Sequence, residues 1–146
     1  MALIVCDTDF LIKISNDPLP KVDLRDLSKD NQFVVLPSVI REISGLERNV
    51  SSKTARRARM ADRVIKESKH FKIPLFKEDE EISTLKADDA LIEFVKKKPK
   101  ERFLATLDGS LLSRFERTGL PYITLSKGKL FIRPSEGATY LTKRRK

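Results

Sequence analysis

The chain has 146 residues, of which 40% are hydrophobic, which is enough for one domain with its own core and excludes a wholly disordered protein. A single Cys excludes an intrachain disulfide. The sequence shows neither a signal-peptide pattern nor an apolar run near the ~20 residues that a membrane helix needs, so we expect a cytoplasmic protein with no membrane partner. The formal net charge of +9 favours a polyanionic partner such as nucleic acid, although Lys-rich surfaces also serve solubility alone.

The first half of the chain predicts two strand–helix pairs and a long basic helix. Residues 2–6 form a short apolar run typical of a buried parallel strand, and Thr8 is placed to cap the helix that follows. Residues 33–36 predict a second strand, and Pro37 is a favoured first residue for the next helix. Residues 52–70 predict a helix with basic residues opposite an apolar stripe, which is formed by Met60, Ala61, Val64 and Ile65.

The second half continues the alternation of helices and strands. Helices are predicted at residues 87–97 and 111–117, and strands at residues 103–107, 122–125 and 129–132. This alternation indicates an α/β fold: a three-layer α/β/α sandwich with a central, mainly parallel sheet of four to five strands. We assign residues 1–133 to this domain and residues 134–146 to a basic C-terminal tail.

The residue types present exclude several kinds of active site. His70 is the only histidine and falls near the end of a basic helix, and Cys6 lies within an apolar strand, where a small core residue is expected. The sequence contains neither a Gly-rich phosphate-binding loop nor a Cys/His zinc pattern. What remains is carboxylate chemistry, for which the candidates are Asp7, Glu42, Asp89 and Asp108.

These four acids fall where strands end or on the helices that follow. Asp7 and Asp108 come just after predicted strands, and the carboxyl ends of parallel strands share one edge of a sheet. Carboxylates packed together repel unless a cation neutralises them, and oxygen ligands suit Mg²⁺ or Mn²⁺. Each acid also has a structural interpretation: Asp7 begins a turn, Asp108 caps a helix, Asp89 is a helix N-terminal charge and Glu42 is a surface residue. Both interpretations stay open at this point.

Four short motifs resemble those of PIN-domain ribonucleases, in the order in which that family carries them. Val-Cys-Asp-Thr-Asp at residues 5–9 is similar to the first motif, and the helix of residues 37–43, which contains Glu42, is similar to the second. Asp-Asp-Ala-Leu-Ile at residues 88–92 resembles the third motif, and Ala-Thr-Leu-Asp at residues 105–108 resembles the fourth. The resemblance covers almost the whole chain, through Ile132.

The resemblance implies a small α/β/α nuclease that cuts RNA with the help of a divalent metal, Mg²⁺ or Mn²⁺. On this hypothesis Asp7, Asp89 and Asp108 are catalytic residues that ligate the ion directly or through water. Glu42 completes the acidic cluster, and Thr106 steadies a ligand or a water on the ion. All five residues occupy positions that match the motifs of the family.

Two details of the predicted site are ambiguous. Asp88 and Asp89 compete for the third acid, and we prefer Asp89 because it fits the Asp-x-x-Ile spacing better. The chain has Ser110 where many relatives carry a further acid, so the number of metal ions, one or two, is left open.

Two branches of the family fit this chain. One is similar to the PIN nuclease of the eukaryotic small-subunit processome and its archaeal relatives, which act in ribosomal RNA maturation; residues 104–108 and 120–125 look closer to this branch. The other contains the toxins of toxin–antitoxin pairs, which usually dimerise. The resemblance therefore implies RNA as a partner and leaves open a homodimer, an antitoxin or a ribosome-assembly partner.

The basic stretches suit a hold on RNA. Residues 51–72 carry eight Lys or Arg against two acids, and residues 94–102 carry five against one. Such clusters favour contact with a phosphate backbone. The expected RNA-binding residues are Lys53, Arg56, Arg57, Arg59, Arg63, Lys96, Lys97 and Lys98. The main rival hypothesis is a catalytically silent RNA-binding scaffold of the same fold.

Overall fold

A five-stranded sheet forms the centre of the computed structural model, which describes residues 2–16, 29–48, 52–67, 82, 84–126 and 129–133. The strands follow the order β2-β1-β3-β4-β5 across the sheet. The first four pair in parallel, and β5 pairs antiparallel with β4. In chain order the strands are β1 (Leu3–Cys6), β2 (Gln32–Val34), β3 (Arg102–Ala105), β4 (Tyr122–Ser126) and β5 (Lys129–Arg133).

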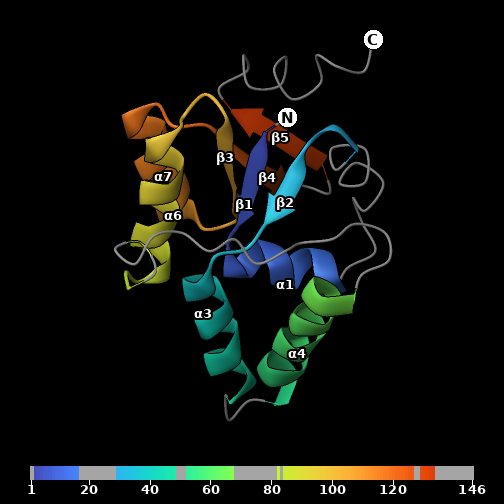
Figure 1. Ribbon diagram of the computed structural model, residues 1–146. Helices are drawn as coiled ribbons and strands as arrows, with labels where there is room; N and C mark the ends of the chain where they lie inside the picture. The colour runs from blue at the N-terminus through green and yellow to red at the C-terminus, as the bar shows by residue number, and fades with distance from the viewer. Residues whose placement is uncertain are drawn as a thin grey trace.

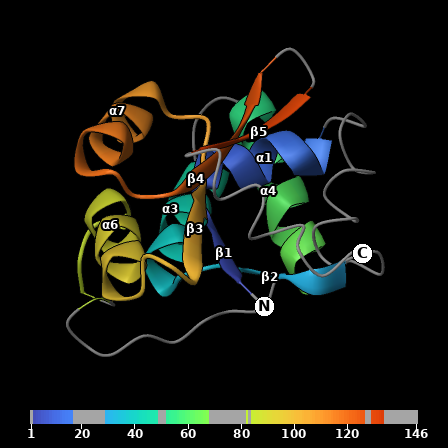
Figure 2. The same cartoon turned by 90° about the horizontal axis from the view of Figure 1, so that it is seen from above.

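Helices cover both faces of this sheet (Figure 1). The helices are α1 (Thr8–Asn16), α3 (Pro37–Glu47), α4 (Ser52–Glu67), α6 (Ala87–Lys97) and α7 (Gly109–Thr118). The view from above shows α6 and α7 on one side of the sheet and α1 and α4 on the other (Figure 2). The helices α3 and α4 pack against each other and extend beyond the edge of the sheet at which the parallel strands end (Figure 1). The predicted α/β fold class is confirmed.

The interior strand β1 illustrates why the sheet lies at the core. Parallel strands pair with β1 on both sides, and helices cover both faces of the sheet (Figure 2). The sequence of β1 is therefore a nearly continuous apolar run. Ile4, Val5 and Cys6 are fully buried. Cys6 pairs in register with Ala105 of β3, and the backbone N–H of Asp7 donates to the carbonyl of Ala105 at 2.9 Å. The two strands therefore end side by side.

The ends of the helices follow local sequence rules. Pro37 is the first residue of α3, where its missing N–H leaves no bond unmade. Asp108 caps α7, and Gly119 ends that helix with φ 69°, a left-handed conformation that glycine adopts without strain. Thr8 differs from the prediction: it is the first residue of α1 rather than its cap, because the Leu11 N–H donates to the Asp7 carbonyl.

The buried side of α4 matches the predicted stripe only in part, because Ala61 is buried and Ile65 packs against the core but Met60 does not. Ala55, Ala58 and Ala61 are buried, whereas Met60 is 38% exposed. Residues three apart on a helix share one side, and these small alanines let α4 pack against α1 and α3. The basic residues of α4 consequently point outward.

Among the described residues, no helix combines the length and apolar character that crossing a bilayer requires.

Candidate metal centre

Asp7 occupies the position directly after β1 and is only 4% exposed. Its Oδ1 accepts a hydrogen bond from the Thr8 backbone N–H at 2.7 Å, and its Oδ2 accepts one from the Thr106 hydroxyl at 2.8 Å. Burial raises the pKa of Asp7 to about 6, and the nearby negative charges of Asp9 and Glu42 add to this rise. The two hydrogen bonds act in the opposite direction because they favour the charged form.

Thr106 connects the ends of the two central strands. Its hydroxyl donates to Asp7 and accepts a hydrogen bond from the Asp108 backbone N–H at 3.1 Å. Thr106 itself is fully buried, so the hydroxyl has a defined place in the structure. One side chain therefore fixes the orientation of the Asp7 carboxylate relative to the chain that carries Asp108.

Asp108 follows β3 by three residues and is the N-cap of α7. Its Oδ1 accepts from the Ser110 backbone N–H and hydroxyl, both at 2.9 Å, and from the Leu111 N–H at 3.4 Å. All three hydrogen bonds reach the same oxygen. The structural interpretation of Asp108 as a helix cap thus applies together with its place in the acidic group. Ser110 therefore holds the Asp108 carboxylate through both its backbone N–H and its hydroxyl.

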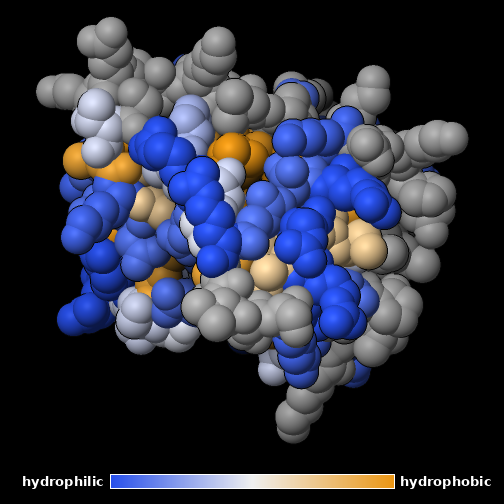
Figure 3. Space-filling view, turned by 90° about the horizontal axis from the view of Figure 1, so that it is seen from below, coloured by the Kyte–Doolittle hydropathy of each residue, from blue (hydrophilic) through white to orange (hydrophobic). Residues whose placement is uncertain are grey.

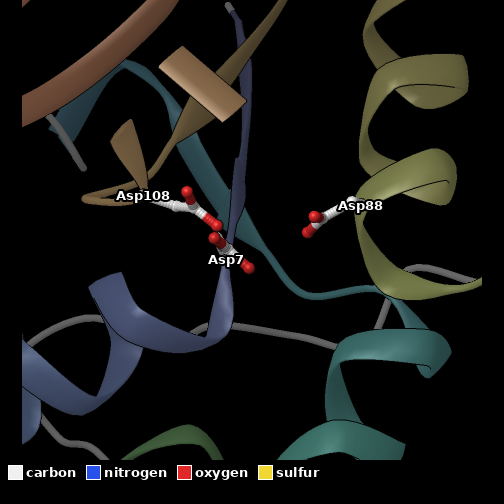
Figure 4. Close-up of side chains that lie close together, drawn as sticks. All are labelled: Asp7, Asp88 and Asp108. Atoms are coloured by element: carbon white, nitrogen blue, oxygen red, sulfur yellow. The ribbon is translucent and has the colours of Figure 1, made fainter. Parts of the chain in front are cut away.

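The third acid brought to this place is Asp88 of α6. One carboxylate oxygen of each of Asp7, Asp88 and Asp108 lies within 4.8 Å of the corresponding oxygens of the other two (Figure 4). Figure 4 shows the Asp7 and Asp108 side chains directed at one another, with Asp88 pointing toward them from α6. Burial raises the pKa of Asp88, and the negative charge of Asp108 raises it further.

Asp89, which the motif spacing favours, does not join this group. Consecutive residues of a helix point about 100° apart, and α6 buries Ala87, Ala90 and Leu91. Asp88 flanks that buried side, whereas Asp89 lies roughly opposite to it. The Asp89 side chain is 54% exposed and forms an ion pair with Arg114 of α7, whose Nη2 lies 3.5 Å from Oδ1.

Two further acids stand around the group. Glu42 of α3 is exposed and lies outside the three-carboxylate group, although its charge raises the pKa of Asp7. Asp9, in the first turn of α1, is exposed, and its charge raises the pKa of both Asp7 and Asp88. Asp9 was not among the candidates predicted from the sequence. Its position two residues after Asp7 was the signal available, because both residues lie where β1 ends and α1 begins.

The donor set fits a small divalent cation. Oxygen ligands of Mg²⁺ or Mn²⁺ sit ~2.0–2.2 Å from the ion, so ligands on opposite sides are at most ~4.4 Å apart. The 4.8 Å limit on the three oxygens is close to that span. Burial is the main cause of the raised pKa of both Asp7 and Asp88, so a bound cation would stabilise their charged forms.

The residues predicted to contact RNA lie on two helices. Lys53, Arg56, Arg59 and Arg63 of α4 are exposed, and Arg57 is half-buried. Lys96, Lys97 and Lys98 are exposed at the C-terminal end of α6, the end of that helix remote from Asp88. Figure 3 shows the molecule from below, the side to which α3 and α4 extend, and hydrophilic side chains cover most of the coloured surface, with small apolar areas between them.

Cys6 and His70 are the two other reactive side chains that the sequence analysis considered. Cys6 is fully buried, and burial raises the pKa of its thiol well above the usual range, so it is a core residue rather than a nucleophile. His70 and the tail of residues 134–146 lie outside the described residues.

Solved structures with a similar fold include the PIN domain endonuclease Utp24, which shares 19% sequence identity over 90% of each chain with a TM-score of 0.57. A domain of a functionally unknown protein from Methanocaldococcus jannaschii DSM 2661 shares 20% identity over 88% of this chain and 94% of its own, with a TM-score of 0.58. No protein-family model matches the sequence, and no curated protein matches it. The chain therefore has the PIN-domain fold, as the four motifs predicted.

Proposed function

We propose that the protein is a metal-dependent endonuclease that hydrolyses RNA, with Asp7, Asp88 and Asp108 holding Mg²⁺ or Mn²⁺. The observation that carries this proposal is the meeting of three carboxylates, from three separate elements, at the carboxyl edge of a PIN-type sheet. Asp88 takes the position for which the sequence favoured Asp89. The likeness to the Utp24 endonuclease supports the reaction class, since the two chains share the fold over almost their full lengths.

The ion, when bound, would polarise the phosphodiester and activate water for attack. The protein supplies a prepared set of ligands. Thr106 and the Thr8 N–H hold both oxygens of Asp7, and the first turn of α7 holds Oδ1 of Asp108. Fixed ligands need little reorganisation, so binding energy is not spent on ordering them. No side chain of the described site needs to form a covalent bond with the substrate.

Glu42 and Asp9 would act from the rim of the site. Both are exposed, and both are close enough to Asp7 for their charges to raise its pKa. An acid at this distance can accept a hydrogen bond from a water near the ion and orient that water. We assign Glu42 and Asp9 this orienting role, and we place the direct contacts to the ion on the three aspartates.

The basic helices supply the counterpart to this acidic centre. RNA is a polyanion, and its approach to several carboxylates is unfavourable unless cations outweigh the repulsion. The exposed Arg and Lys residues of α4 offer such cations next to α3, the helix that carries Glu42. This arrangement supports an RNA substrate. A role in ribosomal RNA maturation, an antitoxin partner and a homodimer remain predictions from the family resemblance.

Cleavage of a mixed-sequence RNA pool tests the proposal. We expect the wild-type protein to cut RNA in Mg²⁺ or Mn²⁺ and to stop when EDTA is added, and a DNA pool of the same sequences to be cut much more slowly. Asp7→Asn and Asp108→Asn should lose the activity. Asp62→Asn is the matched control, because Asp62 pairs with Lys66 on α4 and takes no part in the acidic group. Equal cutting by all four proteins would identify a contaminating nuclease and refute the proposal.

A further inference from the structure

A groove with a volume of about 460 Å³ runs along α6, the helix that also carries Asp88. This volume falls within the ~300–1,000 Å³ of typical small-molecule sites. Three apolar side chains line the groove: Ile82, Leu85 and Ile92. Its remaining lining consists of four charged side chains, three from α6 and one from α7.

The groove lies on the side of α6 that carries Asp89, and its lining residue Arg114 is near enough to Asp88 for its positive charge to act on that carboxylate. Asp89, Glu93 and Lys97 follow one another at intervals of four residues, so they form one stripe on α6. This stripe is about 12 Å long at 1.5 Å per residue. Its first member is adjacent in sequence to Asp88. A strand that has one phosphate at the metal centre and continues along this stripe would bring a neighbouring nucleotide to the groove.

The chemistry of the lining suits a nucleotide better than a bare phosphate. Among the described lining residues, two acids and two bases balance formally, whereas a site for phosphate alone requires an excess of positive charge. A nucleobase combines apolar faces with donors and acceptors at its edges. Leu85 and Ile92 offer an apolar surface to the face, and the charged side chains offer partners to the edge.

Arg114 connects the groove to the metal centre. It pairs with Asp89 at 3.5 Å, which is longer than the ~2.7–2.9 Å of a strong charge-assisted hydrogen bond, and both side chains are about half exposed. Exposed pairs of this kind contribute little to stability, so their exchange for another partner costs little. A guanidinium binds a phosphate through two parallel hydrogen bonds and also stacks on bases.

We propose that the groove along α6 is a subsite for one RNA nucleotide next to the scissile phosphate, in which Arg114 leaves Asp89 for the nucleotide's phosphate and Leu85 and Ile92 contact its base. This inference rests on the proposed nuclease function and adds to it a place where the substrate is recognised. Asp89 has a defined part in this subsite: it holds Arg114 in position while the groove is empty.

The test is an NMR titration of the full chain in Mg²⁺, with 5′-AMP, ribose 5-phosphate and inorganic phosphate as separate probes. We expect 5′-AMP to shift the amide signals of Leu85, Ile92 and Lys97, and to bind at least tenfold more tightly than ribose 5-phosphate. Arg114→Gln should weaken 5′-AMP binding about tenfold. Arg117→Gln is the matched control. It changes an exposed Arg on the same helix that contacts the Ser113 carbonyl and does not line the groove.

Two results would overturn the proposal. Equal binding of 5′-AMP and inorganic phosphate, or equal losses in the Arg114 and Arg117 variants, would mean that general charge attraction governs binding. If the amide signals of the groove residues do not shift with 5′-AMP and shift only with protein concentration, the groove is a contact between copies of the chain.

Cleavage kinetics separate this inference from the proposed function. Arg114→Gln should raise KM for the RNA pool about tenfold and change kcat little, because the residue binds a neighbouring nucleotide rather than the reacting phosphate. A wild-type protein that binds 5′-AMP in the groove but cuts no RNA would refute the nuclease proposal alone. A protein that cuts RNA with unchanged KM in the Arg114 variant would refute the subsite alone.

Discussion

The edge of the sheet and the outer side of α4 both carry concentrated charge, but the protein holds the two sets of charges differently. At the sheet edge, Asp7 is buried and both of its oxygens accept hydrogen bonds. On α4, Arg59 and Arg63 are exposed, and the helix packs through small alanines on its other side. The acids are fixed in place at an electrostatic cost, whereas the cations on α4 keep their hydration.

This difference indicates which role suits each region. Like charges that are buried together lose solvation and repel, and they remain useful only if a ligand compensates them. Exposed cations act mainly by their number, and salt screens them. Substitutions at the sheet edge should therefore have large effects that depend on position, and substitutions on α4 should have small and additive ones.

The largest expected effect distinguishes the roles of two adjacent acids, Asp88 and Asp89. Asp88→Asn should lower kcat for RNA cleavage by about 10³-fold, because a metal ligand supplies several kcal/mol of transition-state stabilisation. Asp89→Asn should change KM only by a few-fold and leave kcat nearly unchanged, because Asp89 contacts Arg114 rather than the acidic group. Steady-state kinetics in Mn²⁺ measure both values. The opposite order of effects would restore Asp89 as the third acid.

The next effect is on stability in the absence of metal. The pKa of Asp7 rises from 3.8 to about 6 on folding, so its protonated form favours the folded state, and this contribution is complete below about pH 4 and lost as the pH rises through about 6. In EDTA, Asp7→Asn should match wild type near pH 4 and exceed it at pH 7 by on the order of 2 kcal/mol. Denaturant unfolding at several pH values measures this. A variant that is less stable than wild type at pH 7 would show that Asp7 carries no electrostatic strain.

A smaller effect is expected at Thr106. Thr106→Val removes the donor to Asp7 and the acceptor for the Asp108 N–H, which should destabilise the protein by ~1–2 kcal/mol. Since the Thr106 hydrogen bond lowers the pKa of Asp7, its loss should also move the midpoint of Mn²⁺ binding to higher pH. Thr106→Ser keeps the hydroxyl and should keep the midpoint. An unchanged midpoint in the Val variant would reduce Thr106 to a packing role.

The smallest effects are expected on α4. Arg59→Gln and Arg63→Gln should each weaken binding of a single-stranded RNA two- to threefold and reduce the salt dependence of log K by ~0.7 for each phosphate that is no longer neutralised. Arg133→Gln, which changes an exposed Arg on β5, should alter neither quantity. Fluorescence anisotropy between low and moderate salt gives the slopes. Equal slopes for the Arg59, Arg63 and Arg133 variants would remove α4 from the RNA interface.

The sequence was sufficient to predict the fold because its elements have simple local causes. Apolar runs at residues 2–6 and 103–107 match β1 and β3, and the alternation with helices leads to the mainly parallel sheet. The predicted stripe of α4 was wrong at Met60 because the prediction relied on hydrophobicity alone. Met60 is more hydrophobic than Ala58, but helix geometry and close packing place the small residue inside.

The site was predictable where chain geometry alone determines it. Asp7 and Asp108 follow neighbouring parallel strands, which brings them to one edge. The choice between Asp88 and Asp89 depended on the rotation of α6, and the apolar positions Ala87, Leu91 and Val95 already indicate which side is buried. Those positions put Asp89 on the outer side, so the apolar pattern was a better guide than motif spacing. The hydrogen bonds of Thr106 and the charge of Asp9 depend on tertiary contacts that no local pattern contains.

The central claim is that Asp7, Asp88 and Asp108 hold one divalent ion, and a crystal soaked in Mn²⁺ tests it most directly. The anomalous difference map should show a peak ~2.0–2.3 Å from a carboxylate oxygen of at least two of these aspartates, with any remaining contact through water. The same crystals of Asp88→Asn should lose the peak or most of its height. A peak that contacts Asp89 instead, or a map with no peak at the edge of the sheet, would contradict this claim.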